Sequence, residues 1–378
     1  MPVTSSQSSQ PITDASADTI ADIGELALIE RLKPFCAEGS IGDDAALMPT
    51  RAGHQMVVTT DMLSENVHFS DRTTPPYAVG WRAAAANLSD LAAMGARPLG
   101  ITVGLGLPKN TRLSWVEALY QGMSDCLKAH GGVIVGGDLC RARQRTVSIT
   151  AVGEVLPSQA IRRRSAIPGM TVVVTGPHGA SRAGLALLLG ELTLLPGYRS
   201  SGHRFPEHCD YDSARDSVCD STWIRAHQMP IPRFDAVEAL RGLISTIGST
   251  HPELASSDSL ASPYPTVAGM DSSDGLANAL LQISESAQVG MDIVSADIPL
   301  PAGLSEAVGA QTALEWALYG GEDFELVLCL PAAIAQPFIK TKFATAIGQT
   351  TDSGIVQLLP EANSTKGLPL TYGSYKHF

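Results

Sequence analysis

The stretch YAVGWRAAAANLSDLAAMGA (77–96) has a helical pattern, and GITVGLGL (100–107), a short run typical of a buried strand, follows it closely. The same alternation continues in both directions. Further strands are predicted at 56–61, 132–138, 146–155, 170–176, 324–330 and 343–349. Further helices are predicted at 113–131, 179–191, 234–246 and 275–288. Such alternation is typical of α/β or α+β proteins, and we expect two domains joined near residues 155–170.

We place the first domain at residues 21–155 and the second at 156–378. Residues 1–20 are polar and are expected to be a disordered tail. Two irregular stretches in the second domain, about 196–222 and 247–266, are predicted to be surface insertions. The first contains His203, His208, Cys209 and Cys219, so a zinc site is an alternative there, although the spacing matches no familiar ligand pattern.

Charge and composition exclude several classes of function. The 378-residue chain has a formal charge of −12 and a pI of about 5.2, whereas nucleic acids and anionic membranes select clustered Lys and Arg. No apolar run is long enough for a membrane span, and the start lacks the features of a signal peptide. The six cysteines form no CxxC pair, which fits reduced thiols in the cytoplasm.

Aspartates recur in one context, beside small residues at the end of an apolar run. They are Asp43 and Asp44 in IGDDAAL, Asp61 in VVTTDML, Asp90 in NLSDLAAMG, Asp138 in IVGGDLC, and Asp271 and Asp274 in MDSSDGL. Glu322 and Asp323 in YGGEDFEL are a further pair. Charges near a core are costly unless paired, and no basic residue lies within these motifs. Oxygen ligands alone favour Mg²⁺, so the set predicts several Mg²⁺ ions around a polyphosphate.

Each aspartate alone also has a structural explanation. Asp274 could cap the helix that begins at 275, Asp90 could be a solvated helical residue, and Asp61 could form a turn at a strand end. The glycines of GGD (136–138) support a phosphate site only weakly. The chain has no Walker A motif, no suitable GxGxxG and no protein-kinase signature, so any ATP site must use a different cradle.

Six motifs, in order, carry a family resemblance. IGDDAAL, TTDMLSENVHF, NLSDLAAMGARP, GGDLCR, MDSSDGL and YGGEDFEL resemble the motifs of thiamine-monophosphate kinase, an enzyme of the aminoimidazole ribonucleotide synthetase superfamily. The resemblance extends from about residue 22 to the C-terminal YKHF and fails over the tail and the two insertions. It implies an aminoimidazole ribonucleotide synthetase-like fold with an N-terminal β-sheet domain, a C-terminal α/β domain, and homodimers that share a β-barrel.

The resemblance also implies an activity and a site: ATP- and Mg²⁺-dependent phosphorylation of thiamine monophosphate to thiamine diphosphate in the cleft between the domains. The implied Mg²⁺ positions are Asp44, Thr59, Thr60, Asp61, Asp90, Asp138, Asp271 and Asp274. The implied ATP positions are Gly137, Asp138, Arg163 and Ser273, with Arg162 and Arg164 as alternatives to Arg163. The implied substrate positions are His68, Glu322 and Tyr372, where the family often has Trp at the last.

Two other functions compete with the kinase. One is another ATP-using synthetase of the same superfamily, although the N-terminal tail lacks the reactive Cys of selenophosphate synthetases and the chain ends in Phe378 instead of the Cys of hydrogenase-maturation relatives. The other is a non-catalytic protein that binds divalent metal through the same aspartates. The spread of the acidic motifs over both expected domains favours an interdomain cleft instead.

Overall fold

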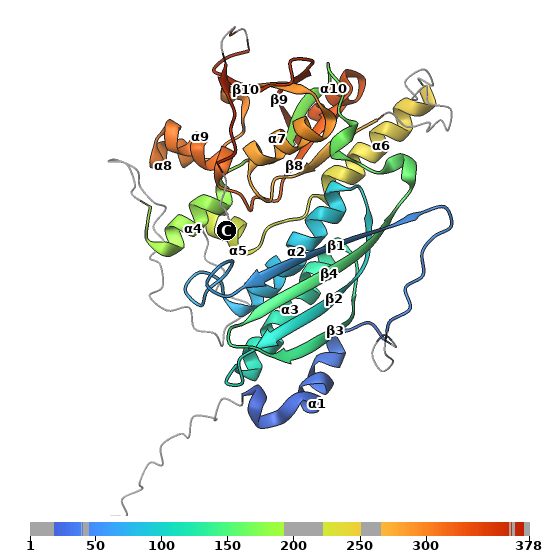
Figure 1. Cartoon of the computed structure of the whole chain (residues 1–378), viewed down its shortest axis with the longest axis vertical. Coiled ribbons are helices and arrows are strands. Elements are labelled where there is room, and N and C mark those ends of the chain that lie inside the picture. The colour runs from blue at the N-terminus through green and yellow to red at the C-terminus, as the bar shows by residue number, and fades with distance from the viewer. Residues whose placement is uncertain are drawn as a thin grey trace, which may run out of the picture.

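Two β-sheets with helices packed against them make up the computed structural model (Figure 1). It describes residues 19–38, 40, 45–192, 222–250, 266–362, 364 and 367–373, with only the backbone described at 247–250. Most of the predicted tail, most of both predicted insertions, and the alternative zinc ligands therefore lie outside the described residues. Within the described part of the chain, no helix is long and apolar enough to cross a membrane.

The N-terminal sheet has four strands in the order β1-β4-β2-β3. They are β1 (Gln55–Ser64), β2 (Arg97–Leu107), β3 (Ile134–Arg141) and β4 (Thr146–Val155). β4 is antiparallel to both of its neighbours, while β2 and β3 run parallel because α3 (Leu113–His130) connects them. Together with α2 (Pro76–Ala93), α3 covers one face of this sheet, and α1 (Ile20–Leu32) lies beside β3 in the view of Figure 1.

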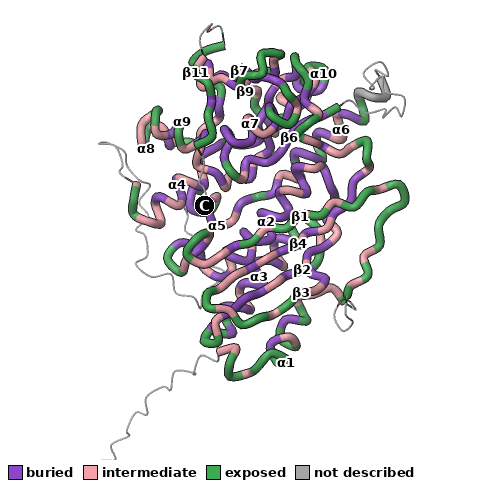
Figure 2. Tube along the Cα trace, in the orientation of Figure 1, coloured by how far each residue is buried: buried purple, intermediate pink, exposed green. Residues whose placement is uncertain are grey.

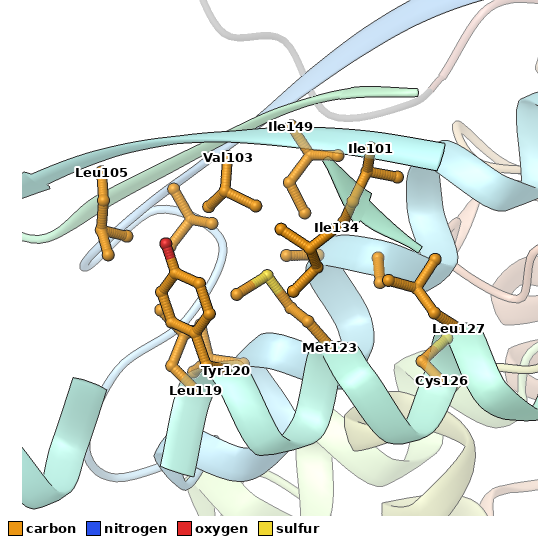
Figure 3. Close-up of a cluster of buried hydrophobic side chains, with 14 of the residues drawn as sticks. Ile101, Val103, Leu105, Leu119, Tyr120, Met123, Cys126, Leu127, Ile134 and Ile149 are labelled. Atoms are coloured by element: carbon orange, nitrogen blue, oxygen red, sulfur yellow. The ribbon is translucent and has the colours of Figure 1, made fainter. Parts of the chain in front are cut away.

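Alternating apolar residues of the strands build the core beneath these helices. Ile101, Val103 and Leu105 of β2 point toward Leu119 and Met123 of α3 (Figure 3). Figure 2 shows α2 as almost wholly buried, because its Ala-rich surface packs on the sheet and also on α3. This burial fixes α2 rigidly relative to the N-terminal sheet.

Glycines set the spacing between α2 and α3. A Cβ at Gly80 of α2 would lie 1.8 Å from the carbonyl oxygen of Leu119, and a Cβ at Gly122 of α3 would lie 1.9 Å from that of Tyr77. Because both gaps are far below van der Waals contact, no other residue fits at either position without moving a helix.

The outer face of the N-terminal sheet is exposed along β1. Met56, Val58 and Met62 of β1 are exposed on this face, opposite the helices. Exposed apolar side chains gathered along one strand are uncommon on a monomeric protein and mark an interaction surface.

The C-terminal sheet has seven strands in the order β11-β10-β7-β9-β5-β8-β6. They are β5 (Thr171–Thr175), β6 (Ala268–Asp271), β7 (Gly290–Val294), β8 (Leu326–Leu330), β9 (Ala344–Thr351), β10 (Val356–Leu359) and β11 (Leu368–Pro369). Helices α7 (Leu276–Ala287) and α9 (Ala310–Tyr319) pack on one face, and α6 (Phe234–Thr250) and α10 (Ala332–Lys340) pack on the other. Figure 1 shows α4 (Ala180–Leu189) and α5 (Thr222–Gln228) between this layer and the N-terminal sheet, with α8 (Leu304–Val308) next to α9.

The expected mixed α/β fold is confirmed, and every helix and strand predicted from the sequence is present with small shifts in its ends. Three expectations need correction. Asp61 forms no turn, because β1 continues to Ser64. The GGD segment does not end its strand, because β3 continues to Arg141. The stretch predicted as an insertion from 247 begins as helix, since α6 continues to Thr250.

Candidate active site

Strand β1 and helix α2 bring together the first acidic pair. Thr59 and Asp61 point from β1 toward α2, where the Thr59 hydroxyl donates to Oδ2 of Asp90 at 2.5 Å. The backbone N–H of Asp61 donates to Oδ1 of Asn87 at 3.0 Å, one turn earlier on the same helix. Asp90 is therefore held by a specific partner, and the alternative of a merely solvated helical residue is wrong.

Strand β6 of the C-terminal sheet delivers Asp271 to the same place. Its carboxylate accepts from the hydroxyl of Ser89 on α2 at 2.7 Å and from that of Ser273 at 3.0 Å. Asp271 is only 3% exposed. The Ser89 bond joins the two sheets, so the site lies between them, as the spread of the acidic motifs predicts.

These carboxylates repel one another. Burial, and then the charges of Asp90 and Asp274, raise the pKa of Asp61 to about 6. Burial and Asp90 raise the pKa of Asp271 to about 7, although Ser89 and Ser273 oppose this. The pKa of Asp90 is also raised, chiefly by burial, while Thr59 and Arg163 lower it. A cluster of like charges in a partly dry site is a place where a cation would bind.

A ladder of side chains along α7 joins Asp274 to Arg163. The amide of Asn278 donates to Oδ2 of Asp274 at 3.0 Å, and the amide of Gln282 donates to Oδ1 of Asn278 at 3.1 Å. Nη1 of Arg163 then donates to Oε1 of Gln282 at 2.5 Å. Asn278 and Gln282 are four apart, so they lie on one face of the helix, and Asp274 lies just before its N-cap residue.

The expectation that Asp274 caps α7 is wrong, and Arg163 is distinguished from its two neighbouring arginines. Asp274 does not cap α7, because Gly275 occupies the N-cap position and no side chain caps the helix. Of the three neighbouring arginines, Arg163 is the one whose charge acts on Asp90. Arg162 lines a separate cavity beside α6.

The donor set fits Mg²⁺ in the mode typical of nucleotide sites. Among the described residues, no three His, Cys, Asp or Glu side chains converge into a cage that could hold a metal ion alone. However, Mg²⁺ usually takes only one or two carboxylates and completes its shell with water and phosphate oxygens. Asp61, Asp90, Asp271 and Asp274 are oxygen donors, and the charges of Asp274 and Asp90 act on their neighbours in this cluster, which suits that mode.

A second polar group lies beside this cluster and contains Glu322. Its carboxylate forms an ion pair with the buried Arg82 of α2, and it lies 3.9 Å from Nδ1 of His227. Burial raises the pKa of Glu322, but Arg82, His227 and His68 outweigh it, so the pKa lies below the ordinary value. His68 is thus close to Glu322, while its own Nδ1 accepts from the backbone N–H of Ser64 at 3.1 Å. The two predicted substrate residues are brought together.

The other acidic residues of the YGGEDFEL motif serve the fold. Asp323 accepts from the backbone N–H groups of Gly179 and Ser181 at 2.7 and 2.9 Å, which satisfies the start of α4. Glu325 accepts from Thr175 at 2.6 Å and from Arg233 at 2.5 Å. Neither carboxylate is free to meet a ligand.

Three predicted residues lie apart from the acidic cluster, on or behind the outer face of the N-terminal sheet. Thr60 points outward, 2.9 Å from the hydroxyl of Thr150. Asp138 lines a cleft of about 700 Å³ over the same face, together with Thr150. At Gly137 a Cβ would lie 2.1 Å from the carbonyl oxygen of Val103, so close strand pairing is enough to explain this glycine.

Two further predicted residues remain, Tyr372 and Asp44. Tyr372 is 48% exposed, and Glu285, near the end of α7, raises its pKa, after burial, to about 12. It therefore lies near Glu285 of α7. Asp44 lies outside the described residues.

Comparison with known proteins assigns the family. The family described as AIR synthase related protein, N-terminal domain, matches residues 42–155. A thiamine-monophosphate kinase of Synechococcus elongatus is 44% identical over 362 residues, which are 95% of this chain and 98% of that protein. This chain belongs to the thiamine-monophosphate kinase family.

Solved structures agree with membership in the thiamine-monophosphate kinase family. The thiamine-monophosphate kinase of Stenotrophomonas maltophilia is 31% identical, with a TM-score of 0.68, over 90% of this chain and 98% of that one. AaThiL, complexed with AMPPCP and TMP, is 28% identical, with a TM-score of 0.62, over 94% of this chain and 99% of that one. The resemblance seen in the six sequence motifs is thus confirmed.

Several residues that organise the site of this thiamine-monophosphate kinase family member were not predicted from the sequence. Arg82 and Ser89 both lie on α2, seven residues apart, and contact Glu322 and Asp271. A seven-residue spacing places two side chains on one helix face, so the NLSD motif and an arginine two turns earlier were a usable signal. Asn278 and Gln282 had a similar signal in their spacing of four.

Proposed function

We propose that this protein transfers the γ-phosphoryl group of ATP to the phosphate of thiamine monophosphate, giving thiamine diphosphate and ADP. The observation that carries this is the acidic cluster between the two sheets, with Asp61 and Asp90 from one side and Asp271 and Asp274 from the other. It lies next to the His68 and Glu322 group, because the backbone N–H of Glu322 donates to the carbonyl oxygen of Ser273 at 2.7 Å, so nucleotide and acceptor would meet at one place.

The residues of the chain would act mainly by positioning, because phosphoryl transfer needs little covalent chemistry from a protein. Asp61, Asp90, Asp271 and Asp274 would hold Mg²⁺, with Asp44, Thr59, Thr60 and Asp138 as further proposed ligands. The bound Mg²⁺ would screen phosphate charge. Ser273 and Arg163 would contact ATP, as would Gly137 and Asp138.

Thiamine monophosphate would be oriented by His68, Glu322 and Tyr372. Its acceptor oxygen is already ionised near neutral pH, so direct transfer requires no strong general base and no phosphoenzyme. Arg82 would fix the carboxylate of Glu322 and thereby act through it.

We also propose a homodimer formed through the outer face of the N-terminal sheet. The exposed Met56, Val58 and Met62 support this, since they lie together on the β1 part of this face. In a β-barrel shared by two copies, this face of each sheet would be enclosed. The β3 edge of one copy would then lie against the β1 edge of the other. In that arrangement Asp138 and Thr60 could serve one site. The division into domains at residues 155–156 and the cytoplasmic location stay predictions.

The deciding experiment is product analysis of the purified protein with ATP, Mg²⁺ and thiamine monophosphate. Equal amounts of thiamine diphosphate and ADP are expected. ATP hydrolysis without thiamine diphosphate would favour another synthetase of the superfamily. Binding of Mg²⁺ with no ATP turnover at any Mg²⁺ concentration would favour a non-catalytic metal-binding protein.

A further inference from the structure

A second cavity lies away from the acidic cluster, between the segment that follows β4 and helix α6. Its volume is about 210 Å³, and its lining includes Arg162, Arg241, Ser158, Ser165 and Thr266. None of the described residues that line it is an Asp or a Glu. The chain has a net charge of −12, yet this cavity has two arginines and no carboxylate among its lining residues.

This cavity is separate from the site between the sheets. Val237, Leu240 and Ile244 of α6 form its apolar wall and belong to the core on the α6 and α10 face of the C-terminal sheet. The ladder that holds Asp274 runs along α7, which packs on the opposite face. An occupant of the cavity would therefore not overlap the acidic cluster.

The two arginines have few competing partners. Arg241 donates to the carbonyl oxygen of Gly95, just beyond the end of α2. Burial, and then the charge of Arg51, lower the pKa of Arg241, while Glu238, on the same helix, opposes this. The side chain of Arg162 lines the cavity and has no hydrogen bond or ion pair with the described part of the chain. The cavity therefore has positive charge available for an anion.

The shape and chemistry of the lining limit what can bind. Two guanidinium groups and three hydroxyl groups suit a phosphate or carboxylate, because guanidinium recognises planar or tetrahedral anions through several bonds at once. The apolar wall from α6 suits a hydrocarbon portion. The volume is below that of pockets for drug-sized ligands, which start at about 300 Å³.

We propose that this cavity is a binding site for a small organic anion, in which Arg162 and Arg241 bind the anionic group and Val237, Leu240 and Ile244 contact an apolar body. The site is distinct from the places where ATP and thiamine monophosphate would bind. It does not depend on the kinase activity.

Isothermal titration calorimetry of the full chain with phenyl phosphate tests the proposal, in buffer with EDTA so that the acidic cluster carries no Mg²⁺. Saturable binding is expected, and inorganic phosphate should bind at least about tenfold more weakly because it lacks the apolar body. No binding of phenyl phosphate, or equal affinity for both probes, would overturn the proposal.

Matched variants locate the site. Arg162→Gln should weaken phenyl phosphate binding at least about tenfold, whereas Arg164→Gln removes the same charge from the same short segment outside the cavity and should bind as the wild type does. Ser165→Leu fills part of the cavity and keeps both arginines, and it should weaken binding as well. Wild-type affinity in Arg162→Gln and Ser165→Leu, or equal loss in Arg164→Gln, would show that the anion binds elsewhere.

Discussion

At the residue scale, Asp271 is a residue of the site that lowers the stability of the fold. The side chain is buried, two serine hydroxyls donate to it, and it still faces the charges of Asp90 and Asp61. A buried carboxylate with no cation beside it costs free energy of folding. Its presence is explained by a ligand that brings positive charge, which is the role we propose for it.

Asp271→Asn separates these two effects. The substitution keeps the shape and removes the charge, so we expect kinase activity to fall on the order of 100-fold or more. In EDTA the same variant should unfold at a higher temperature than the wild type, by about 2–4 °C for each kcal/mol of repulsion removed. Steady-state kinetics and thermal unfolding measure the two. Full activity, or a lower unfolding temperature in EDTA, would contradict the role assigned to Asp271.

Glu154 should make the free energy of unfolding depend on pH in the acidic range. The backbone N–H of Arg51 and the guanidinium of Arg97 hold the pKa of this carboxyl at about 2, below its ordinary value of 4.5. A depressed carboxyl pKa adds stability that is fully present above pH 4.5 and is lost as the pH falls toward 2. Urea unfolding at pH 6, 4.5 and 3 should therefore show a steeper loss for the wild type than for Glu154→Gln. Parallel curves would count against this ion pair.

At the scale of elements, α2 and α7 do most of the positioning. Helix α2 supplies Asp90 and Ser89 to the acidic cluster and Arg82 to Glu322. Helix α7 supplies the ladder from Asp274 to Arg163. Because each helix is packed against its sheet, the side chains along it keep fixed spacings, which is what in-line transfer requires.

Asn278→Ala tests the ladder. Without the amide, Asp274 loses its partner and Gln282 loses the group that orients it toward Arg163, so we expect a 10- to 100-fold loss in kcat/KM for ATP. Gln121→Ala on α3 is the matched control, because Gln121 donates in the same way to Asp125, four residues away, at 2.9 Å. The control should keep full activity. Equal effects of the two substitutions would mean that the ladder only stabilises a helix.

Sequence patterns predicted the elements better than the contacts between them. The 3.6-residue and two-residue periods of α2 and β2 are local properties, so both elements were predictable. The partners of Glu322 and Asp271 were not, because Arg82 and Ser89 are far from them along the chain. The absence of a basic residue from the motif around Glu322 did not mean that Glu322 lacks a cationic partner, since tertiary packing brings Arg82 to it.

At the scale of the whole molecule, the exposed β1 part of the outer face of the N-terminal sheet is the surface through which we propose that two copies associate. Val58 on β1 is 58% exposed, and Ile355, in the C-terminal half, is 56% exposed. We expect Val58→Lys to give monomers by sedimentation velocity, since a charge at the centre of an apolar interface is costly. Ile355→Lys places the same charge on a surface outside the proposed interface and should leave the assembly unchanged. A monomeric wild type, or a dimeric Val58→Lys variant, would refute the proposed interface.

The whole site was only partly predictable from the sequence for a related reason. Thr59, Asp61, Asp90, Asp271 and Asp274 gather between the sheets, whereas Thr60 and Asp138 point to the outer face. A sequence motif indicates that a residue has a function, but it does not give the direction of the side chain. That direction depends on strand register, because neighbouring residues of a strand face opposite sides. Thr60 and Asp61 differ by one position and point to different surfaces.

The backbone contact between α2 and α3 limits how far this protein can drift in sequence. Gly80 and Gly122 belong to neither the acidic cluster nor the Glu322 group, yet a single methyl group at either would push α2 away from α3. Since α2 carries Ser89, Asp90 and Arg82, that small displacement would reach both halves of the site. Two residues with no side chain are thus as intolerant of replacement as the aspartates, and an inherited change at either would resemble an active-site lesion.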